Sequence, residues 1–226
     1  MKISRLLSDS LTIANKDLRI ELRARILTNQ VVPFALMVLV LFGIALDADQ
    51  RALRIFAPGL FWIAVLLCTL LAISRSMDVE LADGAAVGLR LSGISPAAVF
   101  LGKALAVVAQ LLVLEFFLSA GIILLYRSNI EDMILFLLTG VVSCVAIAVA
   151  GTLFGLLASG LGVRETLLPI LLFPVLLPVL IASTRAFDDA LGVAAVNGWN
   201  WLTFVAGLTV ILIVVGLAAN YILIED

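Results

Sequence analysis

Residues 74–103 read SRSMDVELADGAAVGLRLSGISPAAVFLGK and form the longest polar interruption between hydrophobic runs after the amino-terminal segment. Ser76 can cap a helix whose first turns are acidic, because the positive end of the helix dipole favours carboxylates. Gly93 can end that helix, and Pro96 can open the next one. The stretch therefore predicts a short helix between two long apolar ones.

This short helix has one apolar edge, because Leu81, Ala85 and Leu89 recur at intervals of four residues. Its two internal glycines each destabilise it by about 1 kcal/mol relative to alanine, so it needs a surface to dock against. Composition leaves a second interpretation open, in which residues 74–96 are a solvated loop between two membrane helices.

The composition of the whole chain decides the class of protein. Hydrophobic residues make up 64% of the 226 residues, charged residues only 13%, and the mean hydropathy is +1.26. A soluble domain does not need that much apolar surface, whereas a bundle of membrane-spanning helices does. A span takes about 20 residues, so roughly six fit in this chain. We expect a single all-α transmembrane domain over residues 1–226.

The apolar runs predict six spans, of which the third can begin at Ala97 or at Lys103: 31–46, 55–73, 97–126 or 103–126, 133–158, 167–184 and 201–224. Residues 1–30 have apolar side chains at every third or fourth position and cations mostly on the other side. That pattern is typical of an amphipathic helix in the membrane interface. The first run is short, so we expect the interfacial helix to turn directly into it. The longest connection after residues 74–96 is expected at residues 185–200.

The distribution of cations predicts the orientation of the bundle. With the amino terminus in the cytoplasm, ten cations lie on that side: Lys2, Arg5, Lys16, Arg19, Arg23, Arg25, Arg75, Arg90, Lys103 and Arg164. The opposite side receives four: Arg51, Arg54, Arg127 and Arg185. Because cations accumulate on the cytoplasmic side, both termini and residues 74–96 are predicted to be cytoplasmic, and residues 185–200 periplasmic.

Three spans have features that predict their packing. The fourth has a stripe of small residues where another helix can approach closely: Gly140, Cys144, Ala148, Gly151 and Gly155. The fifth is expected to be kinked or locally broken, because it contains three prolines: Pro169, Pro174 and Pro178. The second is entered through residues 57–59, which predicts Trp62 near the membrane interface.

The chain offers little from which an active site could be assembled. It has no histidine, and Cys68 and Cys144 both lie inside apolar runs, where they are expected to pack rather than bind a metal or form a disulfide. No nucleophile with a base, paired carboxylates or metal-ligand set can be put together. We therefore expect a protein that is not an enzyme.

Glu115 is an ionisable residue in the middle of an otherwise apolar predicted span. It lies roughly 18 Å along its helix from Lys103, near the middle of the bilayer. A carboxyl group there is costly unless it is paired or protonated, which makes it a functional candidate. The alternative is a structural role in the bundle interior, with hydrogen bonds to polar neighbours. The candidates for such neighbours are Gln110, Ser119 and Ser143.

Several motifs resemble the haem exporter protein B (CcmB) family, the permeases of system I cytochrome c maturation. They are APGLFW at residues 57–62, ELADG at residues 80–84, LGK at residues 101–103 and the proline-bearing run at residues 168–184. The resemblance covers nearly the whole chain, including its length and its six spans.

The resemblance implies a non-catalytic permease subunit of an ABC-type complex in the inner membrane. Its implied partners are a second copy of itself, two CcmA-type ATPase subunits, a CcmC-type haem-handling protein, a small CcmD-type protein and a periplasmic haem chaperone. ATP and Mg²⁺ would be bound by the ATPase and haem by partner proteins, with no nucleic acid involved. The residues implied to couple to the ATPase are Glu80, Leu81, Asp83, Gly84, Ala85 and Leu89.

Two other classes of protein remain as alternatives. A secondary carrier is expected to show inverted repeats and several polar sites within the membrane, and neither is evident here. A passive membrane scaffold would not need a structured cytoplasmic helix together with a span that contains three prolines.

Overall fold

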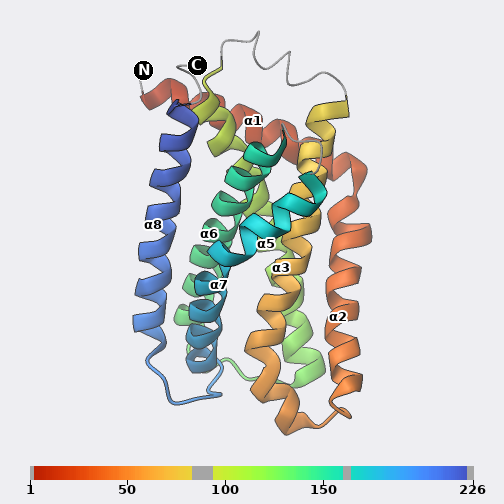
Figure 1. Ribbon diagram of the computed structural model, residues 1–226. Helices are drawn as coiled ribbons and strands as arrows, with labels where there is room; N and C mark the ends of the chain where they lie inside the picture. Colours follow the sequence, from red (N-terminus) through yellow and green to blue (C-terminus); the bar gives the residue numbers. More distant parts are fainter. Residues whose placement is uncertain (1–2, 83–93, 160–163, 223–226) are drawn as a thin grey trace.

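The computed structural model describes residues 3–82, 94–159 and 164–222, which form an elongated bundle of helices (Figure 1). In chain order the elements are α1 (Ile3–Ala24), the π-helix η1 (Leu27–Val31), α2 (Val32–Ala45), α3 (Gln50–Ala82), α5 (Pro96–Tyr126), α6 (Met133–Ser159), α7 (Arg164–Ala190) and α8 (Gly198–Ile222). Within these ranges there is no β-strand. The predicted all-α fold is confirmed.

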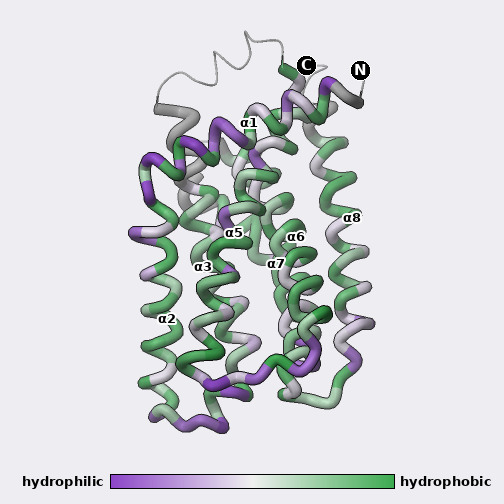
Figure 2. The backbone as a smooth tube through the Cα atoms, turned by 180° about the vertical axis from the view of Figure 1, so that it is seen from behind, coloured by the Kyte–Doolittle hydropathy of each residue, from purple (hydrophilic) through white to green (hydrophobic). Residues whose placement is uncertain are grey.

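Six helical segments of the described chain are long and apolar enough to cross a membrane. They are Leu27–Ala45, Gln50–Ser74, Pro96–Tyr126, Met133–Ala158, Leu168–Ala190 and Gly198–Ala219. Hydrophobic residues follow these spans, while hydrophilic ones gather in α1 and in the connections at the opposite end (Figure 2). The six predicted spans are therefore confirmed, with ends that shift by a few residues.

Helix α1 lies across the end of the bundle at which the chain begins and α8 ends (Figure 1). It stops at Arg25, which has a left-handed backbone conformation (φ 53°) and whose N–H donates to the carbonyl of Glu21 at 2.8 Å. The chain then turns into η1 and α2, so the first span begins at Leu27. This is the direct turn that the short first apolar run predicts.

Helix α3 continues without a break through Ser76 to Ala82. The predicted helix start at Ser76 is therefore wrong. Neither glycine nor proline occurs between Ser74 and Ala82, so nothing in the backbone chemistry interrupts the helix at that point. By contrast, the predicted start of the next helix is confirmed. Pro96 lies in the first turn of α5, and Ser95 Oγ accepts the N–H of Ala98 at 3.3 Å.

Trp62 lies inside the bundle rather than at the membrane interface, so that prediction is also wrong. Its side chain is 1% exposed, and its ring centroid lies 5.3 Å from that of Phe61 and 5.0 Å from that of Phe187. The reason is that α3 begins at Gln50 rather than at residue 55, which places Trp62 more than three turns into the helix.

Helix α7 changes direction along its length. Its first part, drawn in cyan, crosses the bundle obliquely, and its later part runs with the other helices (Figure 1). The three prolines lie inside this one helix. The helix continues to Ala190, so the connection to α8 is shorter than the predicted 185–200. An ion pair one turn apart, from Arg185 to Asp188 at 3.2 Å, supports the last turns.

Helix α6 packs against α3, α5, α7 and α8. The five small residues of its expected packing stripe are all buried: Gly140, Cys144, Ala148, Gly151 and Gly155. They do not all meet the same neighbour. A Cβ atom on Gly151 would overlap Ile73 of α3, whereas one on Gly140 would lie 2.7 Å from the carboxyl oxygen Oε2 of Glu115 in α5. These glycines therefore let α6 approach two neighbouring helices at once.

Candidate functional site

Glu115 lies on α5 and is 8% exposed. It is about 17 Å along the helix from Tyr126, so it lies well inside the span. Its carboxyl group faces α6, where Gly140 leaves room for it and the thiol of Cys144 makes a hydrogen bond to it. Gly140 and Cys144 are four residues apart and so lie on one face of α6. Within the described part of the chain, the other carboxyl oxygen, Oε1, has no hydrogen-bond partner.

None of the three predicted polar neighbours is the partner of Glu115. Ser143 instead lies 2.6 Å from the hydroxyl of Ser183 and so joins α6 to α7. Successive residues of a helix point about 100° apart, so Ser143 and Cys144 face different neighbours. Cys144 is among the small residues predicted to pack between helices, and its thiol is the group that meets Glu115.

The chemistry available at this position is limited. One carboxyl and one thiol can exchange a hydrogen bond, but the described residues provide no group of three His, Cys, Asp or Glu side chains that could hold a metal ion. Two other buried hydroxyl groups of α6, on Thr139 and Thr152, lack a hydrogen-bond partner within the described ranges. The arrangement suits a polar contact between helices better than a catalytic centre.

We predict that Glu115→Gln leaves the fold and the assembly of the protein intact. The amide has the same shape as the carboxyl group and can still accept a hydrogen bond from Cys144. We expect the midpoint of thermal unfolding in detergent to change by no more than about 4 °C, since the loss is below about 1 kcal/mol. A large loss of function in a normally assembled variant would contradict the structural role and assign Glu115 a role that depends on its charge.

A second group of side chains holds α1 against the start of α5. Lys103 is 2% exposed, and its Nζ lies 3.6 Å from Oδ2 of Asp17. A Cβ atom on the preceding Gly102 would lie 2.7 Å from the carbonyl oxygen of Ser10 and from Cβ of Ile13. The motif at residues 101–103 therefore fixes the amino-terminal helix. This contact has no local signal in the sequence, where Lys103 is recognisable only as a cation on one side of the membrane.

Of the residues predicted to couple to an ATPase, the structure describes the backbone of two. Glu80 and Leu81 lie in the last turn of α3. Asp83, Gly84, Ala85 and Leu89 are outside the described residues. The described helices that flank them, α3 and α5, meet that segment at the end of the bundle where α1 lies (Figure 1).

Comparison with known proteins identifies relatives along most of the chain. The family described as CcmB protein matches residues 9–223. Heme exporter protein B of Haemophilus influenzae is 31% identical over 186 residues, which is 80% of this chain and 81% of that protein. Heme exporter protein B of Pseudomonas aeruginosa is 31% identical over 204 residues, or 86% of this chain and 87% of that protein. The protein of that name from Escherichia coli K12 is 37% identical over 73 residues, about a third of each chain.

Proposed function

The chain belongs to the CcmB protein family, the membrane components of haem export systems, and we propose that it is the permease subunit that couples ATP hydrolysis to this export. In the proposed cycle, a cytoplasmic ATPase binds the end of the bundle that carries α1. Its hydrolysis of ATP then drives haem export or the release of a haem-loaded periplasmic chaperone. The chain itself is a multi-pass protein of the inner membrane.

The observation that carries this proposal is the family match, which extends across all six spans. Two features agree with it. Helix α3 runs past its apolar segment, which ends at Ser74, as far as Ala82. These 226 residues also contain no Gly-x-x-x-x-Gly-Lys-Ser/Thr sequence, so a partner would have to bind the nucleotide.

The proposed assembly contains two copies of this chain and two CcmA-type ATPase subunits. A CcmC-type haem-handling protein, a small CcmD-type protein and the periplasmic chaperone complete it. In this scheme ATP and Mg²⁺ are bound by the ATPase and haem by the partner proteins. The contribution of this chain is mechanical, because it transmits the movement of the ATPase through the bundle.

Co-purification with the ATPase tests the proposal. The tagged chain is expressed with a CcmA-type ATPase, purified in detergent, and assayed for bound ATPase and for export of haem or release of the chaperone. We expect the ATPase to co-purify, and we expect function to be lost when the P-loop lysine of the ATPase is replaced. A chain that retains no ATPase, in cells whose haem export is unaffected by that lysine variant, would instead be a secondary carrier or a scaffold.

We also predict that the isolated chain does not bind haem through an axial protein ligand. The sequence contains no histidine, and the two cysteines are buried. Met37 and Met133 are exposed side chains on different helices, and Met77 lies in the part of α3 whose side chains are not described. Titration of purified protein with ferric haem should therefore give no stoichiometric spectrum of axially ligated haem. Such a spectrum, removed by replacing one methionine or cysteine, would contradict this prediction.

A further inference from the structure

A hollow of about 650 Å³ opens at the end of the bundle opposite α1. Three chain segments that are distant in sequence line it. They are the first turns of α3, the connection between α5 and α6, and the connection between α7 and α8. We propose that this hollow binds the phosphate group of an anionic phospholipid in the leaflet at that end of the protein.

Three of the four cations assigned to this end of the molecule line the hollow: Arg51, Arg54 and Arg127. Across the described ranges, none of their guanidinium groups takes part in a salt bridge or a side-chain hydrogen bond. Glu131 is the one carboxylate that lines the hollow, so the lining has a net positive charge. Arginine presents a planar fork of donors that matches the oxygens of a phosphate.

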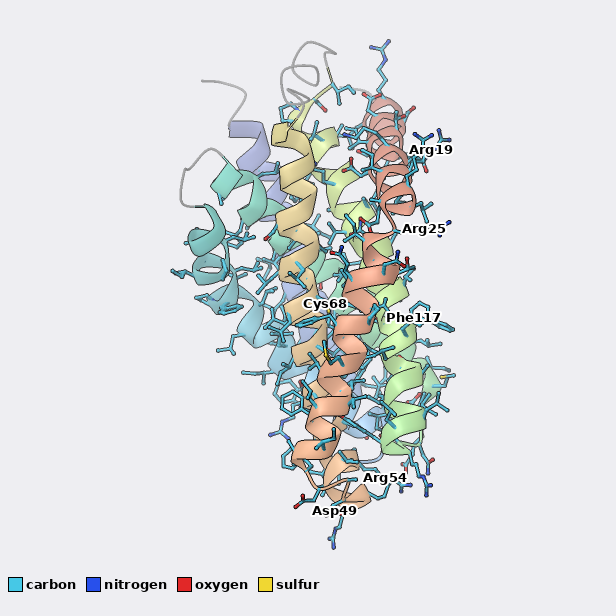
Figure 3. The ribbon with its side chains drawn as sticks, turned by 90° about the vertical axis from the view of Figure 1, so that its right-hand side faces the viewer. Arg19, Arg25, Asp49, Arg54, Cys68 and Phe117 are labelled. Carbon is cyan, nitrogen blue, oxygen red and sulfur yellow. The ribbon has the colours of Figure 1, made fainter. Side chains whose placement is uncertain are left out.

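Two of these arginines occupy positions that the helix itself disfavours. Arg51 and Arg54 lie in the first turns of α3, where the helix dipole presents its positive end. Figure 3 shows Arg54 there, close to the turn that leads from α2 into α3 and contains Asp49. An anion bound in the hollow would interact favourably with both guanidinium groups and with the helix end, and so offset this repulsion.

Arg127 occupies a strained position for an arginine. It ends α5 in the left-handed conformation, with φ 52° and ψ 36°, where glycine is the less strained residue. The Arg127 side chain lines the hollow from this position, and its left-handed backbone costs conformational free energy.

A buried hydroxyl group supplies independent support for a ligand. Ser128 lines the hollow and is 5% exposed, yet its Oγ has no hydrogen-bond partner in the described part of the chain. Buried hydroxyl groups are rarely left without a partner. The Oγ atom is itself covered, so a phosphate oxygen held by the neighbouring arginines would accept this hydrogen bond once the Ser128 side chain rotates toward the hollow.

The frame of the hollow is held in place by backbone hydrogen bonds. The N–H groups of Glu131 and Asp132 both donate to the carbonyl of Ala190, at 2.8 and 3.1 Å, and so join the α5–α6 connection to the end of α7. Gly192, with φ 61°, lets the carboxyl group of Glu131 lie where a Cβ atom would otherwise be. The connection that follows Arg127 is therefore tied to the end of α7.

The apolar residues that line the hollow indicate that the bound phosphate group belongs to a lipid. Ile55, Leu191 and Val193 form apolar parts of the wall, and the side chain of Ile55 is 50% exposed beside the charged groups. A site that combines free cations with an apolar wall at the end of a span suits a phosphate head group attached to acyl chains. A free phosphate would use the arginines and Ser128 but leave the apolar wall uncovered.

The test compares lipid retention by two variants of the full chain. Arg54→Gln/Arg127→Gln removes two of the cations that line the hollow. Arg185→Gln is the matched control, because Arg185 belongs to the same end of the molecule but pairs with Asp188 and does not line the hollow. Each protein is purified from an equal mixture of phosphatidylglycerol and phosphatidylcholine, and the bound lipids are counted by native mass spectrometry. Circular dichroism confirms that the variants are folded.

We expect the wild-type chain and Arg185→Gln to retain phosphatidylglycerol in preference to phosphatidylcholine. In the double variant, the ratio of bound phosphatidylglycerol to bound phosphatidylcholine should fall by at least about tenfold. The preference should also fall as salt is raised. Stabilisation of the wild type by pyrophosphate alone, lost in the double variant and without lipid preference, would support the phosphate site but replace its lipid source. The proposal is overturned if the double variant matches the wild type with both probes, or if the variant loses only the binding of a carboxylate ligand such as haem. Neither result depends on the ATPase, so it leaves the proposed permease function unaffected.

Discussion

Replacing Gly102 with leucine should release α1 from the bundle. A Cβ atom at this position would lie 2.7 Å from the carbonyl oxygen of Ser10 and from Cβ of Ile13, and a backbone oxygen cannot turn aside as the end of a side chain can. The helices must therefore separate or shift. Overpacking of this kind costs about 1–3 kcal/mol. Separation would also expose Lys103 and Asp17, which form an ion pair in the folded protein.

A cysteine at Ala14 reports the position of α1. Ala14 is 6% exposed, and the two native cysteines are buried. In an Ala14→Cys background we expect slow reaction with a water-soluble maleimide, and a rate increase of at least about tenfold when Gly102→Leu is added, in line with the loss of roughly 1.4 kcal/mol or more.

Gly207→Leu is the matched control for this experiment. It makes the same substitution in a span, on α8, where a Cβ atom would have nothing within 4 Å. The reporter cysteine should remain protected in this variant. If the maleimide reacts equally slowly in Gly102→Leu, the close approach at Gly102 is not what holds α1 in place.

The spans could be predicted from the sequence because a single physical property determines them. A helix that crosses the bilayer must be apolar over its whole length, and this signal survives without knowledge of its neighbours. The start of α5 could likewise be predicted from two neighbouring residues, because Ser95 caps the helix and Pro96 can occupy its first turn. Ser76 shows the limit of such reasoning, because a residue that can cap a helix is also tolerated inside one.

The contacts between helices could not be predicted, because they depend on which way each helix faces. Cys144 was recognised as a small residue, but its partner Glu115 follows from the rotation of α6 relative to α5. The same holds for Lys103 and Asp17, which are 86 residues apart in the chain. Counting cations placed Arg51, Arg54 and Arg127 at one end of the molecule. Only the fold brings them to the same hollow.

Replacing Gly84 with tryptophan should abolish most of the binding of the ATPase. This prediction rests on the sequence and the family, because Gly84 lies outside the described residues. We expect residues 74–96 to dock in a groove of the ATPase, with Leu81, Ala85 and Leu89 against its apolar floor. Gly84 has no side chain, so the surface of the partner can approach the backbone there. An indole would clash with that surface.

The expected loss is at least about tenfold in the amount of ATPase that co-purifies, because a steric clash in a packed interface costs about 1–3 kcal/mol. Release of the haem-loaded chaperone should fall with it. Glu80→Gln and Asp83→Asn should have smaller effects, since exposed ion pairs at the rim of an interface contribute about 0–1 kcal/mol. Gly207→Trp serves as the control for a bulky residue in the same chain, at a position with open space around it.

The thermal stability of the isolated chain separates docking from folding. We expect Gly84→Trp to unfold at the same temperature as the wild type, because the clash arises only in the complex. A lowered unfolding temperature together with lost binding would show that the substitution damages the bundle itself. Normal stability with normal ATPase retention and normal chaperone release would rule out the docking role of this segment.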